Sequence, residues 1–410
     1  MRYCLLPILI ALRRARWLRA ACKWACAFAL VICIASPSRG QGDLIEQAND
    51  ALTKGDYNTA ITKYDQLIRR YPKLAPAYLN RALAYQRKGD YDKAITNYNE
   101  AIRLEPASAN TYHNRGNAFQ LKGDLNAALA DYDKAIQLDP KVANAYGDRG
   151  NLYTSRGKLT EAIRDFDEAI RLDPQNPLEY FARGYAYQQK GDFDKAIADL
   201  DKAIQLNPAL GPVYYNRALA YEFKGNYEKA IEDYGASIRL HFNEALALSD
   251  RGRCYRLKGD YKRALEDFSE AIKLDPKLLA AYHNRAITYE ANGDYEKAIA
   301  EYKQAIGLDA KNASSYNGLA WILSTSPNDR ARDGKKAVEY ANKACLLSEW
   351  KDPNMVDTLA AAYAENSDYE QAIKWATQYL ETPNLSEKET PGARSRLALY
   401  QAHKPYHRDK

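Results

Sequence analysis

The chain has 410 residues, of which 46% are hydrophobic and 27% are charged. This balance excludes a disordered chain, and the length suits one long repeat array or two to three ordinary domains. The formal net charge of +6 comes from the first 40 residues, which hold seven basic and no acidic side chains. The remainder is close to neutral and gives no general electrostatic reason to bind nucleic acid.

Residues 1–40 have the features of an export signal. A long basic region precedes the apolar run Trp24–Ala35, and small residues follow at Ser36, Ser38 and Gly40. The 12 residues of this run suit the core of a signal peptide and fall short of the ~20 that span a membrane. We expect a cleaved signal peptide or an uncleaved inner-membrane signal anchor, unless the start codon is wrongly assigned. Either signal makes the rest of the chain periplasmic or secreted.

A 34-residue period organises the chain after the leader. The residue seven positions before each periodic glycine is Ala or Gly, and the residue five positions after it is always Ala. Proline usually lies seventeen positions after it, but Phe242 and Ala310 replace this proline, and we expect those junctions to bend differently. The periodic glycines are Gly55, Gly89, Gly123, Gly157, Gly191, Gly225, Gly259 and Gly293.

Each period predicts two helices. Apolar residues recur at helical spacing within residues 77–88 and 92–104. Gly89 ends the first helix in a left-handed conformation that favours glycine, and Asp90 caps the second helix through its side chain. Pro106 cannot continue the second helix and marks the turn to the next period. One hairpin cannot bury its apolar face alone, so the copies must stack.

This pattern resembles the tetratricopeptide repeat family. The resemblance implies an all-α fold, an α-solenoid of helix-turn-helix repeats that forms a right-handed superhelix. Eight regular units cover residues 41–312, and two divergent units cover residues 313–382, with an insertion at Ser324–Arg332. We expect residues 383–410 to form a C-terminal cap and tail, with a helix around Leu397–Tyr400.

Signals for catalysis and for cofactors are absent from the sequence. It contains no glycine-rich phosphate loop, no nucleophile elbow and no HExxH motif. Beyond the leader only Cys254 and Cys345 remain, too few for a disulfide framework, and we expect both to be packing residues. Pro405 separates His403 from His407, and we expect a solvated tail there. The sequence thus predicts no enzyme, no cofactor and no metal.

Arginine recurs eight positions before the periodic glycine, and six of these seven repeats have an acid eight positions after the glycine. We interpret this correlation as structural pairs that bridge the two helices of one hairpin, with ligand binding by arginine as the alternative. The expected pairs are Arg115 with Asp131, Arg149 with Asp165, Arg183 with Asp199, Arg217 with Asp233, Arg251 with Asp267, and Arg285 with Glu301.

Asparagine or aspartate recurs nine positions before the glycine, although Asn is a poor residue inside a helix. In proteins that this chain resembles, the first helix of each repeat lines the concave face. A similar series of asparagines, one per repeat, binds peptide backbone in protein O-GlcNAc transferases. The resemblance implies a peptide-binding groove lined by this series of residues, which Ala182 interrupts. The alternative is that they are solvated groove residues that recur only because the repeats inherited the same residue. The candidate groove residues are Asn80, Asn114, Asn117, Asp148, Asn151, Asn216, Asp250 and Asn284.

These features predict a non-enzymatic scaffold that binds extended peptides or partner proteins in its concave groove. The alternative is a structural factor in envelope assembly that acts through the convex face or by self-association, and an enzyme is the least favoured reading. No lysine occurs ten positions before the glycines, so we do not expect the family's clamp for a C-terminal carboxylate. We expect no nucleic-acid partner, and membrane contact only through a retained leader.

Overall fold

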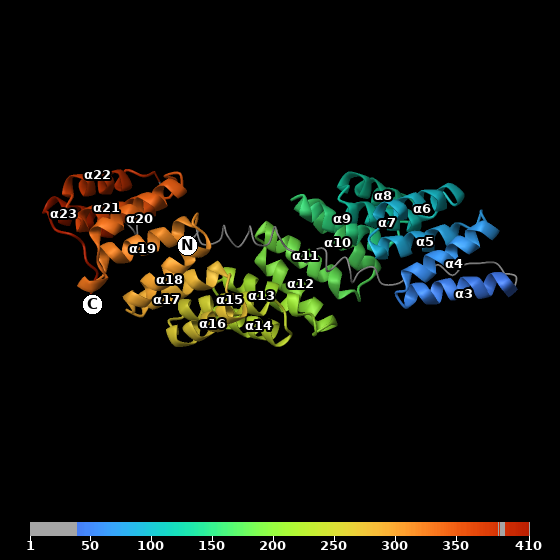
Figure 1. Ribbon diagram of the computed structural model, residues 1–410, viewed down its shortest axis with the longest axis horizontal. Helices are drawn as coiled ribbons and strands as arrows, with labels where there is room; N and C mark the ends of the chain where they lie inside the picture. The colour runs from blue at the N-terminus through green and yellow to red at the C-terminus, as the bar shows by residue number, and fades with distance from the viewer. Residues whose placement is uncertain (1–38, 384, 386–389, 410) are drawn as a thin grey trace. The chain divides into compact units, whose positions relative to one another are not determined.

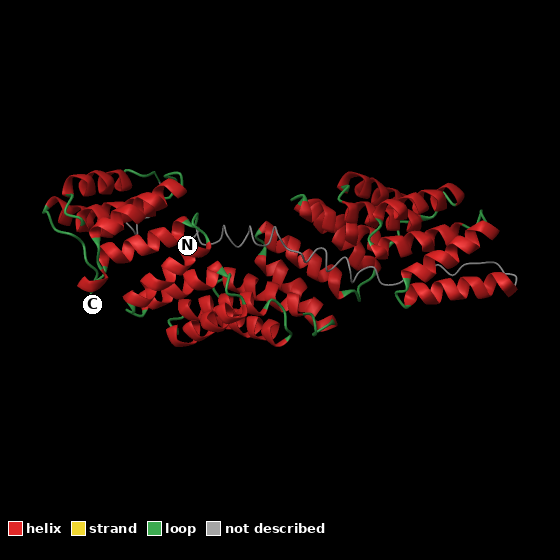
Figure 2. Ribbon diagram, in the orientation of Figure 1, coloured by secondary structure: helices red, strands yellow, loops and turns green. Residues whose placement is uncertain are grey.

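The computed structural model describes residues 39–383, 385 and 390–409 (Figure 1). The expected export signal lies outside the described residues except for Arg39 and Gly40, which begin the first described helix. Figure 2 shows helices joined by loops, and the described residues contain no strand. Within this part of the chain, no helix combines the length and the apolar character that crossing a membrane requires.

The helices pair into hairpins, and the chain divides into two units between Asn207 and Pro208. Within each unit, consecutive hairpins pack against one another, so that each unit is an α-solenoid. The first and second helices of the hairpins in unit 1 are α3 (Arg39–Thr53) and α4 (Tyr57–Arg70), α5 (Ala75–Lys88) and α6 (Tyr91–Leu104), α7 (Ala109–Lys122) and α8 (Leu125–Leu138), α9 (Ala143–Ser155) and α10 (Leu159–Leu172), and α11 (Pro177–Lys190) and α12 (Phe193–Leu206).

Unit 2 continues the pattern and ends in an additional helix. Its hairpins are α13 (Gly211–Phe223) and α14 (Tyr227–Arg239), α15 (Glu244–Leu257) and α16 (Tyr261–Leu274), α17 (Leu279–Ala291) and α18 (Tyr295–Leu308), α19 (Ala313–Thr325) and α20 (Gly334–Leu347), and α21 (Pro353–Glu365) and α22 (Tyr369–Leu380). The last helix, α23 (Thr390–Gln401), includes the segment expected to be helical, and the short η2 (Asp329–Ala331) lies in the expected insertion.

The turns inside the hairpins have the predicted chemistry. All eight periodic glycines are left-handed, with φ between 73° and 95°. A carboxylate oxygen of Asp90 accepts a hydrogen bond from the backbone nitrogen of Lys93 at 3.2 Å and so begins α6. In the last hairpin, which lacks the glycine, Ser367 takes the left-handed conformation with φ of 64°. The turn prediction is therefore confirmed.

The two junctions without proline differ from each other. At Phe242 the junction bends, because His241 and Asn243 on either side are both left-handed, with φ of 55° and 47°. Phe242 is buried, and its ring centroid lies 5.8 Å from that of Tyr215. The aromatic side chain therefore fills the core at a place where other repeats have a proline turn.

At Ala310 the prediction that the junction bends differently is wrong. Asp309 has nearly the same backbone angles as Asp139, which precedes a proline: φ is −142° in both residues. The Asp309 carboxylate accepts a hydrogen bond from the nitrogen of Lys311 at 2.9 Å. The same bond, from Lys141 to Asp139, forms at the junction with proline, so the aspartate supports this turn with or without the proline ring.

A small residue on the first helix lets the two helices of a hairpin touch. A Cβ atom built on Gly150 would lie 2.8 Å from the ring of Phe166, which is closer than carbon atoms pack. Gly116 and Tyr132 repeat this arrangement, and both rings are fully buried. The glycine position and the ring therefore fix the spacing of the helices together.

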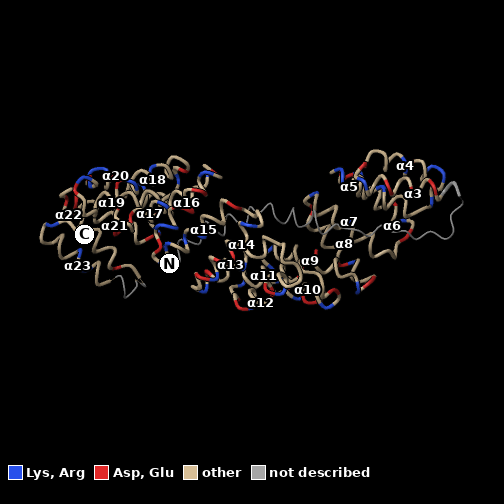
Figure 3. The backbone as a smooth tube through the Cα atoms, turned by 90° about the horizontal axis from the view of Figure 1, so that it is seen from below, with Lys and Arg blue, Asp and Glu red and all other residues tan. Residues whose placement is uncertain are grey.

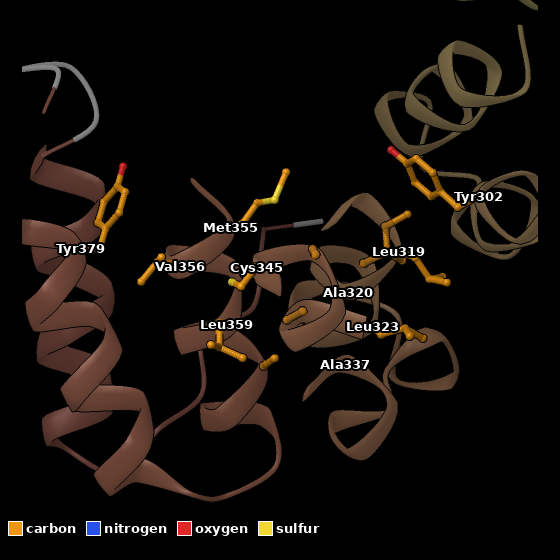
Figure 4. Close-up of a cluster of buried hydrophobic side chains, with 14 of the residues drawn as sticks. Tyr302, Leu319, Ala320, Leu323, Ala337, Cys345, Met355, Val356, Leu359 and Tyr379 are labelled. Atoms are coloured by element: carbon orange, nitrogen blue, oxygen red, sulfur yellow. The ribbon is translucent and has the colours of Figure 1, made fainter. Parts of the chain in front are cut away.

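The last hairpins of unit 2 share a larger aliphatic core. Leu319, Met355 and Leu359 are buried together with the free thiol of Cys345 (Figure 4). Cys254, in an earlier hairpin, is also a buried free thiol. Burial raises the pKa of both thiols, to about 12 for Cys345, so that neither is a ready nucleophile. Both cysteines are packing residues, as expected.

Replacing Gly150 by Val should destabilise the array. The added methyl groups would overlap the buried Phe166 ring, and overpacking of this kind costs about 1–3 kcal/mol. Gly307→Val is the matched control, because nothing lies within 4 Å of a Cβ atom built there. That change should alter stability by less than about 0.5 kcal/mol. Equilibrium urea denaturation measures both effects, and equal midpoints for the two variants would contradict the packing assignment.

Candidate binding face

In seven of the ten described hairpins, an arginine joins the two helices. Nε and Nη2 of Arg149 in α9 donate hydrogen bonds to both carboxylate oxygens of Asp165 in α10, at 2.8 and 2.7 Å. Arg285 makes a single bond to Glu301 at 2.7 Å, and Arg81 uses Asn97 instead of an acid. The two-bond geometry recurs in Arg115 with Asp131, Arg183 with Asp199, Arg217 with Asp233, and Arg251 with Asp267.

A second partner of the arginine, which the sequence analysis missed, comes from the preceding hairpin. Nη1 of Arg149 donates to Asp133 in α8 at 2.7 Å. Each such partner lies 16 residues before its arginine, just as the paired acid lies 16 residues after it. The corresponding contacts are Arg81 with Asp65, Arg115 with Asn99, Arg183 with Asp167, and Arg285 with Ser269. One side chain therefore connects three helices from two hairpins.

The surroundings of Arg149 hold it in place. Its guanidinium carbon lies 5.6 Å from the ring centroid of Tyr146 and 5.9 Å from that of Tyr153. Burial disfavours the charge, but the hydrogen bonds to Asp165 and Asp133 outweigh this cost and raise the pKa of Arg149. Its side chain is only 18% exposed, and that of Asp165 only 8%. These are the features of a structural contact.

Several of the candidate groove residues are occupied by internal hydrogen bonds. Asn117 accepts a bond from the Tyr132 hydroxyl at 2.6 Å, and Asp148 lies 2.7 Å from Nε2 of His113. The remaining members of this group are Asn80, whose amide nitrogen lies 3.4 Å from Oδ1 of Asn49; Asn216, which donates to the carbonyl oxygen of Pro212; and Asp250, which accepts from the hydroxyl of Tyr215 and pairs with Arg253.

Three other candidates keep their polar groups available. The side chains of Asn114 in α7, Asn151 in α9 and Asn284 in α17 are partly exposed and form no hydrogen bond to another described residue. Asn151 occupies the same repeat position as Asn117, but the ring opposite it belongs to Phe166 instead of a tyrosine. Since a phenyl ring has no hydroxyl group, it leaves the Asn151 amide without an internal donor.

A buried carboxyl group lies against α9, the helix that carries Asn151. Glu179, in α11, occupies a repeat position where other units have small residues, and a Cβ atom on Gly147 would lie 2.5 Å from its Oε1. Its Oε2 is buried without a hydrogen-bond partner in the described residues. Burial, together with the charges of Asp148 and Asp173, raises the pKa of Glu179 to about 8. The sequence signal was the glycine at a position otherwise held by larger side chains.

The C-terminal segment is not a solvated tail, so that expectation is wrong. Nε2 of His407 lies 2.7 Å from the Glu365 carboxylate in α21. Arg408 donates from Nη1 to Glu290 in α17 at 2.7 Å. The ring of His403 stacks on Tyr369 at 5.1 Å. The segment thus packs against the first helices α17 and α21 and against the start of the second helix α22, through contacts between residues distant in sequence.

Family comparisons agree with the observed hairpins. A model described as "TPR repeat" matches residues 87–123, 150–191 and 291–323. Models described as "Tetratricopeptide repeat" match residues 42–73, 63–96, 109–142, 131–164, 177–210, 211–243, 245–278 and 268–300. Together these matches cover residues 42–323 except 244, more than half of the chain. A comparison of the sequence with curated proteins found no match.

Several solved structures are similar to the chain. The MamA protein is 27% identical, with 41% of this chain and 92% of that chain covered and a TM-score of 0.37. A tetratricopeptide repeat protein from Parabacteroides merdae is 21% identical, with coverage of 61% and 99% and a TM-score of 0.46. YrrB, described as a protein of this type with an unusual peptide-binding site, is 24% identical, with coverage of 45% and 95% and a TM-score of 0.40.

The two acids at Arg149 should contribute unequally. Asp165 is buried and forms two bonds, so its coupling with Arg149 in a double-mutant cycle should be about 1–3 kcal/mol. Asp133 is 52% exposed and forms one bond, so its coupling should stay below about 1 kcal/mol. Alanine at Arg149 and asparagine at each acid provide the cycles by urea denaturation. Equal coupling for both acids would remove burial as the cause.

Glu179 should make stability depend on pH. Because its folded pKa is raised to about 8 from an ordinary value near ~4.3, the folded chain holds this proton more tightly than the unfolded chain. The resulting stabilisation is complete below pH ~4 and is lost as pH rises towards 8, at no more than about 1.4 kcal/mol per unit. Glu179→Gln should match the wild type at pH 4 and below and exceed its stability at pH 9. Parallel pH profiles of the two unfolding free energies would contradict this.

Proposed function

Because the chain belongs to the tetratricopeptide repeat family, whose members are protein-interaction scaffolds, we propose that its first helices bind extended segments of partner proteins. The observation that carries the proposal is the contrast among the polar residues of these helices. Asn117 is satisfied by Tyr132, whereas Asn114, Asn151 and Asn284 keep both an acceptor and a donor available.

Amide side chains suit the recognition of peptide backbone. An asparagine side chain both donates and accepts hydrogen bonds, and so does each peptide unit of an extended chain. A neutral hydrogen bond contributes only about 0.5–1.5 kcal/mol net, so affinity has to come from several residues together. In unit 1, Asn114 and Asn151 lie on the first helices of adjacent hairpins, α7 and α9, and one ligand segment contacts both in this proposal.

The mixed surface charges of both units give no reason to expect a ligand with a strong charge of one sign. Lys and Arg residues are intermixed with Asp and Glu residues along both units (Figure 3). Asp148 adds negative charge near Asn151, which favours segments with basic or amide side chains, whereas Glu179, with its pKa raised to about 8, is mostly uncharged at neutral pH. The proposed place of action is outside the cytoplasm, which the basic and apolar pattern of residues 1–40 supports.

Peptide selection tests the proposed binding face. A library of random 12-residue peptides displayed on phage is selected on the immobilised chain, and the enriched peptides are synthesised and labelled for fluorescence anisotropy. The double variant Asn114→Ala with Asn151→Ala should bind the enriched peptides that contact unit 1 about tenfold or more weakly, because two or more hydrogen bonds are lost. Helix content by circular dichroism should hold or rise, since Ala is the better helix former.

Two further variants separate recognition from folding. Phe166→Tyr should place a hydroxyl group near Asn151, as Tyr132 does for Asn117, and so weaken peptide binding while the fold persists. Asn342→Ala, on the second helix α20, should leave binding unchanged, because that side chain bonds its own helix at the Val338 carbonyl. Unchanged affinity in the double variant, or failure to enrich any peptide, would refute binding by this face.

A further inference from the structure

The C-terminal segment crosses the first helices of three successive hairpins of unit 2. Residues 404–409 follow α23 without secondary structure, and Figure 1 shows this segment in red, leading away from α23 to the C-terminal label. The backbone nitrogen of Arg408 donates to the carbonyl oxygen of Thr325, at the end of α19, at 2.9 Å. An extended chain is thus held on first helices by a main-chain hydrogen bond, which carries no sequence requirement of its own.

Three side chains of the segment add selective contacts. The Arg408 guanidinium pairs with Glu290 in α17, and its carbon lies 5.2 Å from the ring centroid of Tyr295. His407 contacts Glu365 in α21. The Tyr406 ring lies 6.3 Å from that of Trp321 in α19. The contacted surface therefore suits a segment with an aromatic residue followed by two cationic or protonatable residues.

The two carboxylates are positioned by unit 2 itself. Glu290 accepts a hydrogen bond from Tyr302 at 3.2 Å, and Glu365 accepts one from Arg332 at 2.9 Å. Both acids are nearly buried, with 15% and 14% of their side chains exposed. Burial raises the pKa of Glu290, and Arg408 opposes that rise. Unit 2 thus holds both carboxylates through hydrogen bonds that do not involve the segment.

The segment fits this site incompletely. Nε and Nη2 of Arg408 are buried and have no acceptor among the described residues. A buried donor without an acceptor costs free energy, so the contact is weaker than a fully bonded arginine would make. The segment nevertheless occupies the site because it is tethered to α23, which gives it a high effective concentration.

We propose that the face formed by α17, α19 and α21 is a binding site for extended partner segments that carry an aromatic residue and adjacent cationic residues, and that Tyr406–Arg408 occupies it as an internal competitor. This inference rests on the proposed function, since it assigns a ligand class and a form of regulation to first helices. A partner segment binds there when its cations satisfy Glu290 and Glu365 better than the internal segment does. The site is then inhibited in the free chain and opened by displacement.

The test uses the full chain and a labelled peptide with the sequence of residues 403–409. In fluorescence anisotropy, the variant His407→Ala with Arg408→Ala should bind this peptide at least tenfold more tightly than the wild type, because its own segment no longer competes. Adding Glu290→Gln to that variant should abolish the gain; the Gln side chain can still accept the Tyr302 hydrogen bond, so the fold should be kept. A peptide with alanine at both positions should not bind either chain.

Each other result decides against the inference. Equal affinity of the double variant and the wild type would show that the segment is a structural cap without a competing role. A wild-type dimer in sedimentation that disappears in the double variant would make a second copy the occupant. The enriched peptides that contact unit 1 separate this failure from failure of the proposed function, because their binding depends on Asn114 and Asn151 and should not change in Glu290→Gln.

Discussion

One arginine side chain in seven of the eight regular repeats sets the geometry on which both units depend. Arg149 connects α9 to α10 through Asp165 and to α8 through Asp133. The first contact fixes the two helices of one hairpin, and the second fixes that hairpin against the preceding one. Glycine or alanine under an aromatic ring sets the distance between the same helices. With helix spacing and stacking held by these contacts, the remaining first-helix residues are available for recognition.

The constant parts of the repeat could be predicted from the sequence, and the variable parts could not. The helical pattern, the left-handed glycines and the spacing of the Arg149–Asp165 pair each recur at a fixed period, with the same kind of residue at each position. Asp133 escaped notice because its counterparts are Asn and Ser as well as Asp. Glu179 occurs in a single repeat, so its burial leaves no periodic signal. The segment around Arg408 contacts Glu290 across 118 residues, beyond the reach of any local pattern.

The same residue type has two roles on the first helices, and the difference depends on a single oxygen atom. Asn117 and Asn151 hold equivalent repeat positions, yet Tyr132 engages one and Phe166 leaves the other open. Periodicity in sequence therefore identifies a row of polar residues without separating the structural ones from those that can contact a ligand. That separation requires the opposite helix, where a buried hydroxyl group must find an acceptor.

The symmetric spacing of the arginine contacts also bears on how such a chain changes in length. Arg149 takes one partner 16 residues before it and another 16 residues after it, so all three positions fall within the length of one 34-residue repeat. Loss or duplication of one 34-residue unit within the regular part would place an equivalent hairpin beside each arginine. The number of repeats can therefore evolve in whole steps, each preserving the ion pairs at the new junction, while the reach of the binding surface changes by one hairpin.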